Sequence, residues 1–414
     1  MSKSYDIARE VYASYEIDTE KALKQMDEIP VSINCWQLDD LTGFEDFNAV
    51  PGGGLAATGA APGKPASVEA YFKDMNKMLA LVPGAKKLAL HSIYALTEGR
   101  RIPRNRLEPE HFTGWAEYAK EKGIGLDFNP TYFSHPRAAS GWTLSSPDAS
   151  VRAFWIEHGV RCRRIGQYLG SELNMPCVTN HWIPDGSKDT RADTLGPRER
   201  LRASLDSIFA APADGTPNGE PRPESPKNID SLESKLFGLG CESYTTGSHE
   251  FYSNYVATTG KAILCMDTGH YHPTETVSSK LSSYYAFGQR IMLHISRPVR
   301  WDSDHVPVMS DEVAAIMQEI KRCDAFGRTF IGTDFFDGSI NRIAASVIGA
   351  RTVKAAVLHA LLEPTPLLRK AEEEDNPTKR LVLLEEFKTL PAGLVFAEYC
   401  ERHGVRAHGW LEEI

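Results

Sequence analysis

The sequence lacks the marks of a membrane, secreted or nucleic-acid-binding protein. Its 414 residues contain no apolar run of about 18, so no transmembrane helix is predicted. Residues 1–26 lack the apolar segment and cleavage site of a signal peptide, and their spacing predicts an amphipathic helix instead. The net charge of −9 and the absence of a long basic stripe argue against a nucleic-acid partner. We therefore expect a cytoplasmic protein that binds neither membranes nor nucleic acids.

Cysteine is present but shows no pairing pattern. The seven cysteines are scattered between Cys35 and Cys400, and none belongs to a CxxC pair. This fits reduced thiols in the cytosol and argues against a zinc site built on cysteines. The phosphate-loop motif GxxxxGK[ST], the hydrolase motif GxSxG and the metalloprotease motif HExxH are also absent.

Short apolar runs recur along the chain and predict buried parallel strands. Segments with helical features lie between them, as in Glu110–Lys122, Ser150–Leu169 and Asp311–Arg322. Such alternation is typical of an α/β fold, and eight units favour a (β/α)8 TIM barrel, although an open doubly wound sheet gives a similar local pattern. The eight runs are Val31–Trp36, Lys87–Tyr94, Ile124–Pro130, Pro176–Trp182, Asn228–Lys235, Ala262–Asp267, Ile291–Ser296 and Thr329–Phe335.

Strand patterns stop near residue 350, which suggests two regions. Residues 1–350 would form the barrel with its N-terminal helix, and residues 351–414 a C-terminal helical extension. Such an extension packs either on the barrel or on a neighbouring subunit. Two loops stand out by composition, the Gly/Ala-rich residues 51–63 and the Pro-rich residues 211–227.

Almost every predicted strand ends in a titratable or hydrogen-bonding side chain. Active sites of (β/α)8 barrels form at these ends, and buried charges cost several kcal/mol unless they are paired or bound to metal. In chain order the residues are Trp36, Gln37, His91, Asp127, Asn129, His181, Trp182, Glu233, Lys235, Asp267, His270, His294, Asp302, Asp304 and Asp334.

The carboxylates and imidazoles of the last four strands predict a metal site. Period-two alternation turns Glu233 and Lys235 to one face, and Asp302 and Asp304 converge if their segment is extended. Five close carboxylates would hold protons unless cations neutralise them, and two divalent cations with Lys235 come close to balance. Oxygen and imidazole ligands without sulfur favour Mn²⁺, Co²⁺ or Zn²⁺. Taken alone, His294 could be an ordinary barrel histidine and Asp334 a helix cap.

Long motifs in the chain resemble L-rhamnose isomerase, and the resemblance extends over nearly the whole sequence. The motifs are PVSINCWQLDDLTGFE (30–45), GLDFNPTYFSHP (125–136), WIPDGSKD (182–189), ESKLFGLGCESYT (233–245), MDTGHYHPTE (266–275), HISRPVRWDSDHV (294–306), IGTDFFDGSINRIAA (331–345) and ALLEPTPLLRK (360–370).

The resemblance implies an aldose–ketose isomerase that converts L-rhamnose reversibly to L-rhamnulose, usually as a homotetramer with Mn²⁺. It divides the pooled ligands into two sets: Glu233, Asp267, His294 and Asp334 for the first metal, and His270, Asp302 and Asp304 for the second. It also implies that His91 and Lys235 contact sugar oxygens, beside Glu233 and Asp334, and that Trp182 walls the pocket. With Trp182, apolar groups such as Trp36 and Phe133 are expected to exclude water and hold the apolar face of the sugar.

The implied mechanism is a metal-assisted hydride shift between C2 and C1. A water on the second metal, with Asp302 as its proton partner, moves a proton between O1 and O2, so Asp302, Lys235 and His270 form the expected catalytic group. An enediol route with Glu233 as base is the alternative mechanism.

Other functions remain open at this stage. A related sugar isomerase or epimerase with another substrate, such as D-allulose or D-allose, would present similar residues, and so would a non-catalytic sugar-binding relative. An amidohydrolase is disfavoured because the first strand lacks an HxH motif. The chain departs from the family in a longer 211–227 loop and in Ala60 and Ala61, which stand where bulkier residues are expected.

Overall fold

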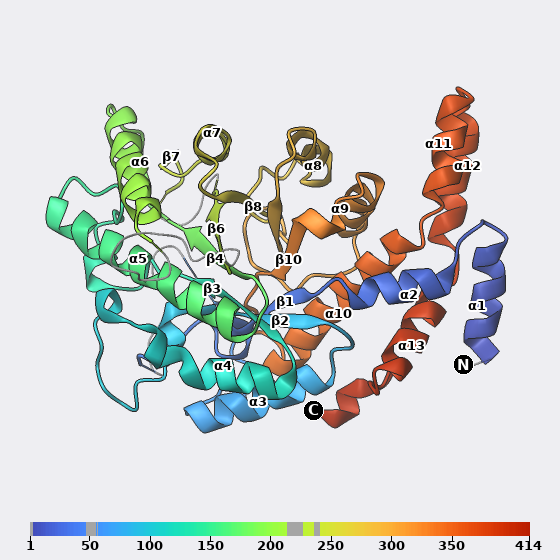
Figure 1. Ribbon diagram of the computed structural model, residues 1–414, viewed down its shortest axis with the longest axis horizontal. Helices are drawn as coiled ribbons and strands as arrows, with labels where there is room; N and C mark the ends of the chain where they lie inside the picture. Colours follow the sequence, from blue (N-terminus) through green and yellow to red (C-terminus); the bar gives the residue numbers. More distant parts are fainter. Residues whose placement is uncertain (1–2, 47–54, 56, 213–226, 236–240) are drawn as a thin grey trace.

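Eight parallel strands close into a barrel in the computed structural model, which describes residues 3–46, 55, 57–212, 227–235 and 241–414. Around the barrel the order is β1-β10-β9-β8-β6-β4-β3-β2, with β2 paired to β1 (Figure 1). The strands are β1 Val31–Asn34, β2 Lys86–His91, β3 Gly125–Asn129, β4 Cys177–Trp182, β6 Asn228–Glu233, β8 Ile263–Asp267, β9 Ile291–Ile295 and β10 Thr329–Thr333. Each overlaps one predicted run, so the (β/α)8 barrel is confirmed.

One helix follows each barrel strand and covers the outside of the barrel (Figure 1). Several of these helices begin at a side chain that accepts a hydrogen bond from the first turn, such as Ser67, Asp148 and Ser310. The helices are α3 Val68–Ala80, α4 Thr113–Lys122, α5 Ala149–Glu172, α6 Leu195–Ala210, α7 His249–Thr259, α8 Ser278–Tyr285, α9 Asp311–Arg322 and α10 Arg342–Leu361.

Short elements lie at the barrel mouth. The first predicted strand ends two residues early because Cys35–Leu38 form a 3-10 helix, and Ser92–Tyr94 form another after β2. At these two points the chain therefore leaves the sheet at the mouth of the barrel. Outside the barrel, β5 (Gly186–Ser187) and β7 (Tyr244–Thr245) pair in a small antiparallel sheet.

The N-terminal segment forms two helices, α1 (Lys3–Ala13) and α2 (Thr19–Asp27), so the single helix expected over residues 1–26 is wrong. Glu16 has a positive φ of 60°, which interrupts the helical backbone. Asp18 then starts α2 by accepting hydrogen bonds from the backbone of its first turn.

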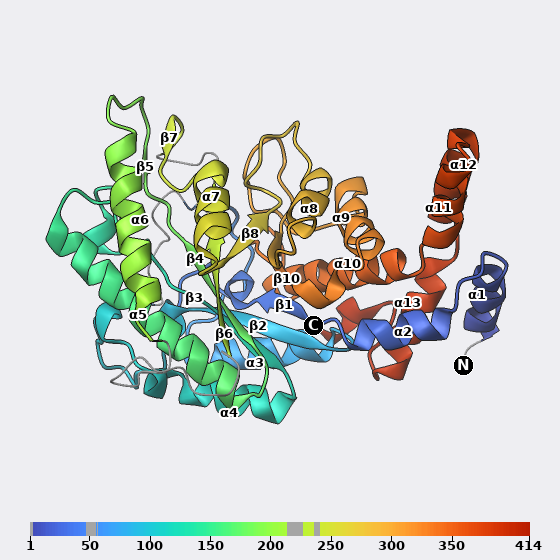
Figure 2. The same cartoon turned by 45° about the horizontal axis from the view of Figure 1, so that its top comes forward.

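The C-terminal segment begins with the barrel helix α10, which runs through residue 350 to Leu361 and packs against β1 and β10. By length and composition α10 could cross a membrane, but most of it is buried, as in the core helix of a globular protein. The helices α11 (Thr365–Glu373), α12 (Pro377–Lys388) and α13 (Ala392–Arg402) follow. α11 and α12 lie side by side and project away from the barrel, whereas α13 packs against α1 (Figures 1 and 2).

Candidate active site

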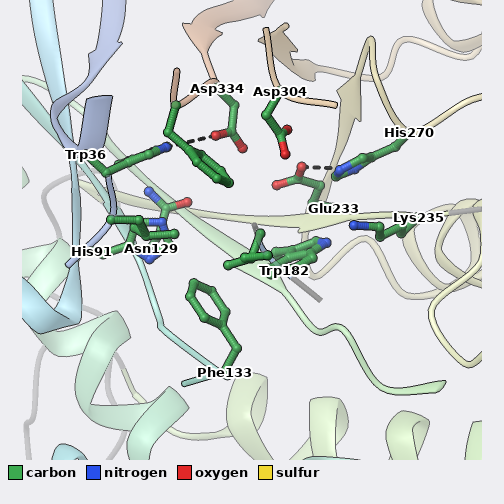
Figure 3. A pocket seen from close by; sticks show the side chains of 13 residues that line it. Trp36, His91, Asn129, Phe133, Trp182, Glu233, Lys235, His270, Asp304 and Asp334 are labelled. Carbon is green, nitrogen blue, oxygen red and sulfur yellow. Dashed lines mark hydrogen bonds and ion pairs between the residues drawn. The ribbon is translucent and has the colours of Figure 1, made fainter. Parts of the chain in front are cut away.

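A pocket opens at the C-terminal ends of the strands, where a (β/α)8 barrel places its active site. Figure 3 shows the side chains that line it. Most of the residues predicted from the sequence are among them, namely Trp36, His91, Asn129, Phe133, Trp182, Glu233, Lys235, His270, Asp304 and Asp334.

Four predicted metal ligands converge on one point. Each brings a possible ligand atom to within 4.8 Å of the others. They stand on neighbouring strands, since Glu233 ends β6, Asp267 ends β8, His294 lies in β9 and Asp334 follows β10. The first three are buried and Asp334 is half-buried. The set is the one that the resemblance assigned to the first metal.

Two of these carboxylates have one oxygen fixed by a neighbouring side chain. The Asn180 amide donates to Oε2 of Glu233, and the Trp36 indole donates to Oδ1 of Asp334 at 3.0 Å (Figure 3). The amide is itself oriented, because the Ser231 hydroxyl donates to its oxygen at 2.9 Å. These contacts set the direction in which each carboxylate presents its other oxygen.

The remaining two ligands carry buried atoms suited to a cation. Oδ1 of Asp267 accepts hydrogen bonds from the Ser296 hydroxyl at 3.0 Å and from the Gly269 amide at 2.6 Å. Within the described residues, Oδ2 of Asp267 and Nε2 of His294 make no hydrogen bond, whereas Nδ1 of His294 lies 3.2 Å from an oxygen of Glu233 and 3.2 Å from an oxygen of Asp334. Leaving a buried polar group unpartnered costs about 1–3 kcal/mol, and a divalent cation would satisfy these atoms together. The donor set therefore fits a metal.

The second predicted ligand set is arranged differently. The Lys235 ammonium lies 2.9 Å from Oδ2 of Asp302, and Nε2 of His270 lies 3.4 Å from the same oxygen. Asp304 lines the pocket, but its φ of +47° shows that the segment is not extended there, contrary to expectation. In the described part of the chain, His270, Asp302 and Asp304 do not gather within the 4.8 Å that unites the first set. Instead, the cation beside Asp302 is the lysine.

Two of the residues listed from the sequence do not line the pocket. Asp127 sits in the middle of β3 and pairs with Lys87, away from the pocket lining. His181 lies 3.0 Å from the Tyr132 hydroxyl and 3.2 Å from a carboxylate oxygen of Asp230. Successive strand residues face opposite sides, so Trp182 reaches the pocket and His181 does not.

Comparison with known proteins agrees with this geometry. The model of the L-rhamnose isomerase (RhaA) family matches residues 1–414. The chain is 50% identical over 412 residues to the L-rhamnose isomerase of Pectobacterium carotovorum subsp. carotovorum (strain PC1), covering 99% of this chain and 95% of that protein. It is 48% identical to the L-rhamnose isomerase of Rhodopirellula baltica, covering 100% of this chain and 94% of that protein.

The chain belongs to the L-rhamnose isomerase family. It is therefore an enzyme of the isomerase class, as predicted. Among solved structures, that of L-ribulose 3-epimerase is similar at 15% identity and a TM-score of 0.48, covering 83% of this chain and 97% of that chain.

The charges in the site of this L-rhamnose isomerase family member are strongly coupled. Burial opposes the ionisation of Glu233, but His294 and His270 beside it lower its pKa to about 2. Burial, together with the charge of Glu233, raises the pKa of Asp267 well above its usual range. Burial and the charge of Asp302 do the same for the pKa of Asp304. Without a cation, some of these carboxylates hold protons, which is the behaviour expected of a site built for positive charge.

Aromatic rings form the opposite wall of the pocket in this family member. The His91 ring packs edge-on against Trp36 at 4.6 Å and against Phe133 at 5.6 Å between ring centroids. Burial lowers the pKa of His91 to about 3, so its imidazole is neutral at physiological pH and can hydrogen bond to a hydroxyl. The Lys235 ammonium lies 4.9 Å from the centre of the Trp182 ring. The pocket thus combines apolar faces with a few directed polar groups, as sugar sites require.

Three apolar lining residues were missed from the sequence: Leu41, Leu55 and Phe336. Leu41 follows Asp40, and both have a positive φ, of 57° and 58°, which no strand or helix pattern reveals. Positive φ is uncommon outside glycine, so the two residues in succession mark a tight turn that shapes this part of the pocket.

Of the two loops singled out by composition, the Gly/Ala-rich one is described in part, at residues 55 and 57–63. Its residues 51–54 and 56, and residues 213–226 of the Pro-rich loop, lie outside the described residues. The backbone N–H of Ala61 donates a hydrogen bond to the carbonyl of Gly338, and its carbonyl accepts one from the Arg342 guanidinium. Arg342 also forms an ion pair with Asp40. Neither Ala60 nor Ala61 is among the described residues that line the pocket.

Proposed function

We propose that this protein interconverts L-rhamnose and L-rhamnulose with two divalent cations, of which Mn²⁺ is preferred and Co²⁺ or Zn²⁺ can substitute. The observation that carries the proposal is the convergence of Glu233, Asp267, His294 and Asp334 beside a pocket that also holds Lys235 and His91. Oxygen and nitrogen donors of this kind suit Mn²⁺. Family membership supports the same assignment.

Both sets of ligands have a role in the proposal. Glu233, Asp267, His294 and Asp334 would hold the first cation, and His270, Asp302 and Asp304 the second. The Lys235 ammonium would then move from Asp302 to a sugar oxygen as the second cation binds. Bound divalent cations supply Lewis acidity, which polarises the sugar oxygens and stabilises developing negative charge.

The side chains of the pocket bind and orient the open-chain sugar. Lys235 and the neutral imidazole of His91 hydrogen bond to hydroxyl groups, beside Glu233 and Asp334. The rings of Trp182, Trp36 and Phe133 hold the apolar face and methyl group of the sugar and exclude water.

Asp302 is proposed to transfer the proton that moves between O1 and O2. Its Oδ2 lies 3.4 Å from Nε2 of His270, which stays beside it, and 2.9 Å from the Lys235 ammonium, which moves to the sugar in this proposal. When the ketose forms, O2 loses a proton, the hydrogen on C2 passes to C1 with its electron pair, and O1 gains a proton. In the reverse direction each transfer runs the other way. The second route, an enediol formed with Glu233 as base, moves the C2 hydrogen as a proton.

Solvent deuterium distinguishes the two routes. The reaction is run in deuterium oxide, and deuterium at C1 of the product is measured by NMR. The hydride shift predicts almost no incorporation, because the transferred hydrogen never exchanges with solvent. Substantial incorporation would rule it out in favour of the enediol.

The activity itself is tested by incubating metal-free protein with L-rhamnose, with and without Mn²⁺, and measuring ketose formation. Turnover should require the cation and stop on addition of a chelator. Parallel reactions with L-mannose, D-allose and D-allulose test activity on other sugars, which we propose as secondary substrates. If one of these reacts while L-rhamnose does not, the protein is a related sugar isomerase or epimerase. Sugar binding without any turnover would indicate a non-catalytic relative.

The proposal includes a cytoplasmic homotetramer. The region from residue 351 onward is proposed as the C-terminal extension that supplies subunit contacts, because α11 and α12 project from the barrel (Figure 2). Apolar side chains on α12, such as Leu381, are exposed.

A further inference from the structure

A thiol lies next to the first ligand set, deeper in the barrel. Cys265 precedes Asp267 by two residues on β8, so both side chains face the barrel interior, with Cys265 one layer further from the mouth. Strand register places Cys265 directly beside Glu233 of β6. The Cys265 sulfur, a Glu233 oxygen and a His294 nitrogen all lie within 4.8 Å of one another.

These three groups are enclosed. Cys265 is fully buried, Glu233 is 3% exposed and His294 is 1% exposed. Nε2 of the imidazole lacks a hydrogen bond within the described residues, and Nδ1 lies 3.2 Å from Oε2 of Glu233, so one ring nitrogen is available to a cation. Below the thiol, Val178 and Met292 pack against it and close the barrel interior with apolar groups.

The first ligand set and the group of Glu233, Cys265 and His294 share two residues but differ in the chemistry of the others. Asp267 and Asp334 add two hard carboxylates to Glu233 and His294, whereas Cys265 adds one soft sulfur. Sulfur ligands favour soft and borderline cations, and carboxylates favour Mn²⁺ and Mg²⁺. Zinc is commonly bound by sulfur, imidazole and carboxylate at once.

We propose that Glu233, Cys265 and His294 form a second, deeper cation site that takes Zn²⁺ or Cd²⁺ in preference to Mn²⁺. The thiol proton passes to solvent as the sulfur–metal bond forms. Because this site shares Glu233 and His294 with the first ligand set, the two cannot be filled together. A soft cation in the deeper site therefore displaces the catalytic cation of the proposed function and inhibits the enzyme.

Cadmium alone tests the site, without any sugar. Metal-free protein is titrated with Cd²⁺, and the ultraviolet sulfur-to-cadmium charge-transfer band is recorded. The wild-type band should saturate at one equivalent. It should be absent from Cys265→Ser and Cys265→Ala, which should also bind Cd²⁺ at least about tenfold more weakly. Two variants are used so that a folding defect in one, seen as a lowered Tm, does not decide the result.

The matched control is Cys241→Ser, which removes a buried thiol that interacts electrostatically with Lys235. This variant should keep the band. The absence of a band in the wild type, or its persistence in both Cys265 variants, would overturn the proposal.

Competition between Cd²⁺ and Mn²⁺ tests whether a cation in the deeper site inhibits the enzyme. In the Mn²⁺-supported isomerase assay, the Cd²⁺ concentration that halves the rate should rise about tenfold in Cys265→Ser relative to Cys241→Ser. An unchanged value would contradict mutual exclusion. This assay rests on the proposed function, whereas the cadmium titration does not. If the chain fails to turn over L-rhamnose, the charge-transfer band still shows whether the deeper site binds a cation.

Discussion

At the scale of single residues, Asp302 is the carboxylate that we propose transfers the proton. Its carboxylate lies between the Lys235 ammonium and the His270 ring. Asp302→Asn keeps the shape of the side chain but removes its capacity to accept a proton. We expect the turnover of L-rhamnose to fall by about 10²–10⁴, while the circular dichroism spectrum remains that of the folded protein. The Tm should fall, because the buried Lys235 loses its ion-pair partner. Asp193→Asn, on an exposed loop, is the control. If Asp302→Asn still isomerises at the wild-type rate, Asp302 has no part in the chemistry.

Trp36 is expected to act on the first cation through Asp334. Its indole N–H fixes Oδ1 of that carboxylate at 3.0 Å. Trp36→Phe keeps an aromatic wall but releases the oxygen, so Mn²⁺ affinity should fall about 10–100-fold by calorimetry. Trp410→Phe, far from the pocket in sequence and absent from its lining, should bind Mn²⁺ as the wild type does. Equal affinities of the two variants would show that the indole contributes only to the pocket wall.

The site residues that could be predicted from the sequence are those that lie in a barrel strand, because the strand pattern fixes where their side chains point. Glu233, Asp267 and His294 lie in apolar runs, and period-two alternation fixes their side. Leu41 could not be found, because its place depends on two successive left-handed residues. Asp304 was found for a partly wrong reason, since its segment is not extended. Loop geometry depends on long-range contacts that local periodicity does not record.

At the scale of elements, the barrel strands were predictable because continuous apolar runs recur, and the helix breaks were not. The second N-terminal helix begins at Asp18. In the sequence, this capping aspartate looks like any acidic residue on the polar side of an amphipathic helix, so the break could not be predicted. The periodicity of the strands also could not show which ligands bind which cation, because neighbouring strands bring all seven ligand residues to the same end of the barrel. Family resemblance, not spacing, separated the two sets.

An ion pair joins a helix near the N-terminus to a helix near the C-terminus. Glu20 of α2 accepts two hydrogen bonds from Arg402 of α13, at 2.7 and 2.8 Å. These bonds lower the pKa of Glu20 to about 2 from its ordinary value of 4.5. A carboxylate with a depressed pKa stabilises the fold above pH 4.5, and this stabilisation is lost as pH falls toward 2.

Glu20→Gln should therefore lower the free energy of unfolding at pH 7 by about 1 kcal/mol or less, since both side chains are more than one-third exposed. The deficit should shrink between pH 4.5 and pH 3 in urea titrations. Glu10→Gln, on the exposed surface of α1, serves as the control and should show no such trend. A deficit that is constant with pH would mean that the ion pair is not its source.

At the scale of the whole molecule, the projecting helices α11 and α12 are the feature that a single barrel does not explain. α12 buries only Phe387 and leaves Leu381 59% exposed and Val382 49% exposed. Exposed apolar groups on a projecting element are typical of surfaces that pack against another chain. We have proposed that they contribute to a homotetramer, so light scattering should give a mass near four times 45.9 kDa.

Replacing both Leu381 and Val382 by Glu places two charges on this surface and should shift the mass toward smaller assemblies at micromolar concentration. Ala257→Glu is the control, because Ala257 is a small exposed residue on α7, on a different part of the barrel. It should leave the mass unchanged. Because the pocket of one chain already holds the ligands and the aromatic wall, the dissociated variant should retain Mn²⁺ binding. A wild type that is monomeric, or a double variant that keeps the full mass, would exclude α12 from the subunit contacts.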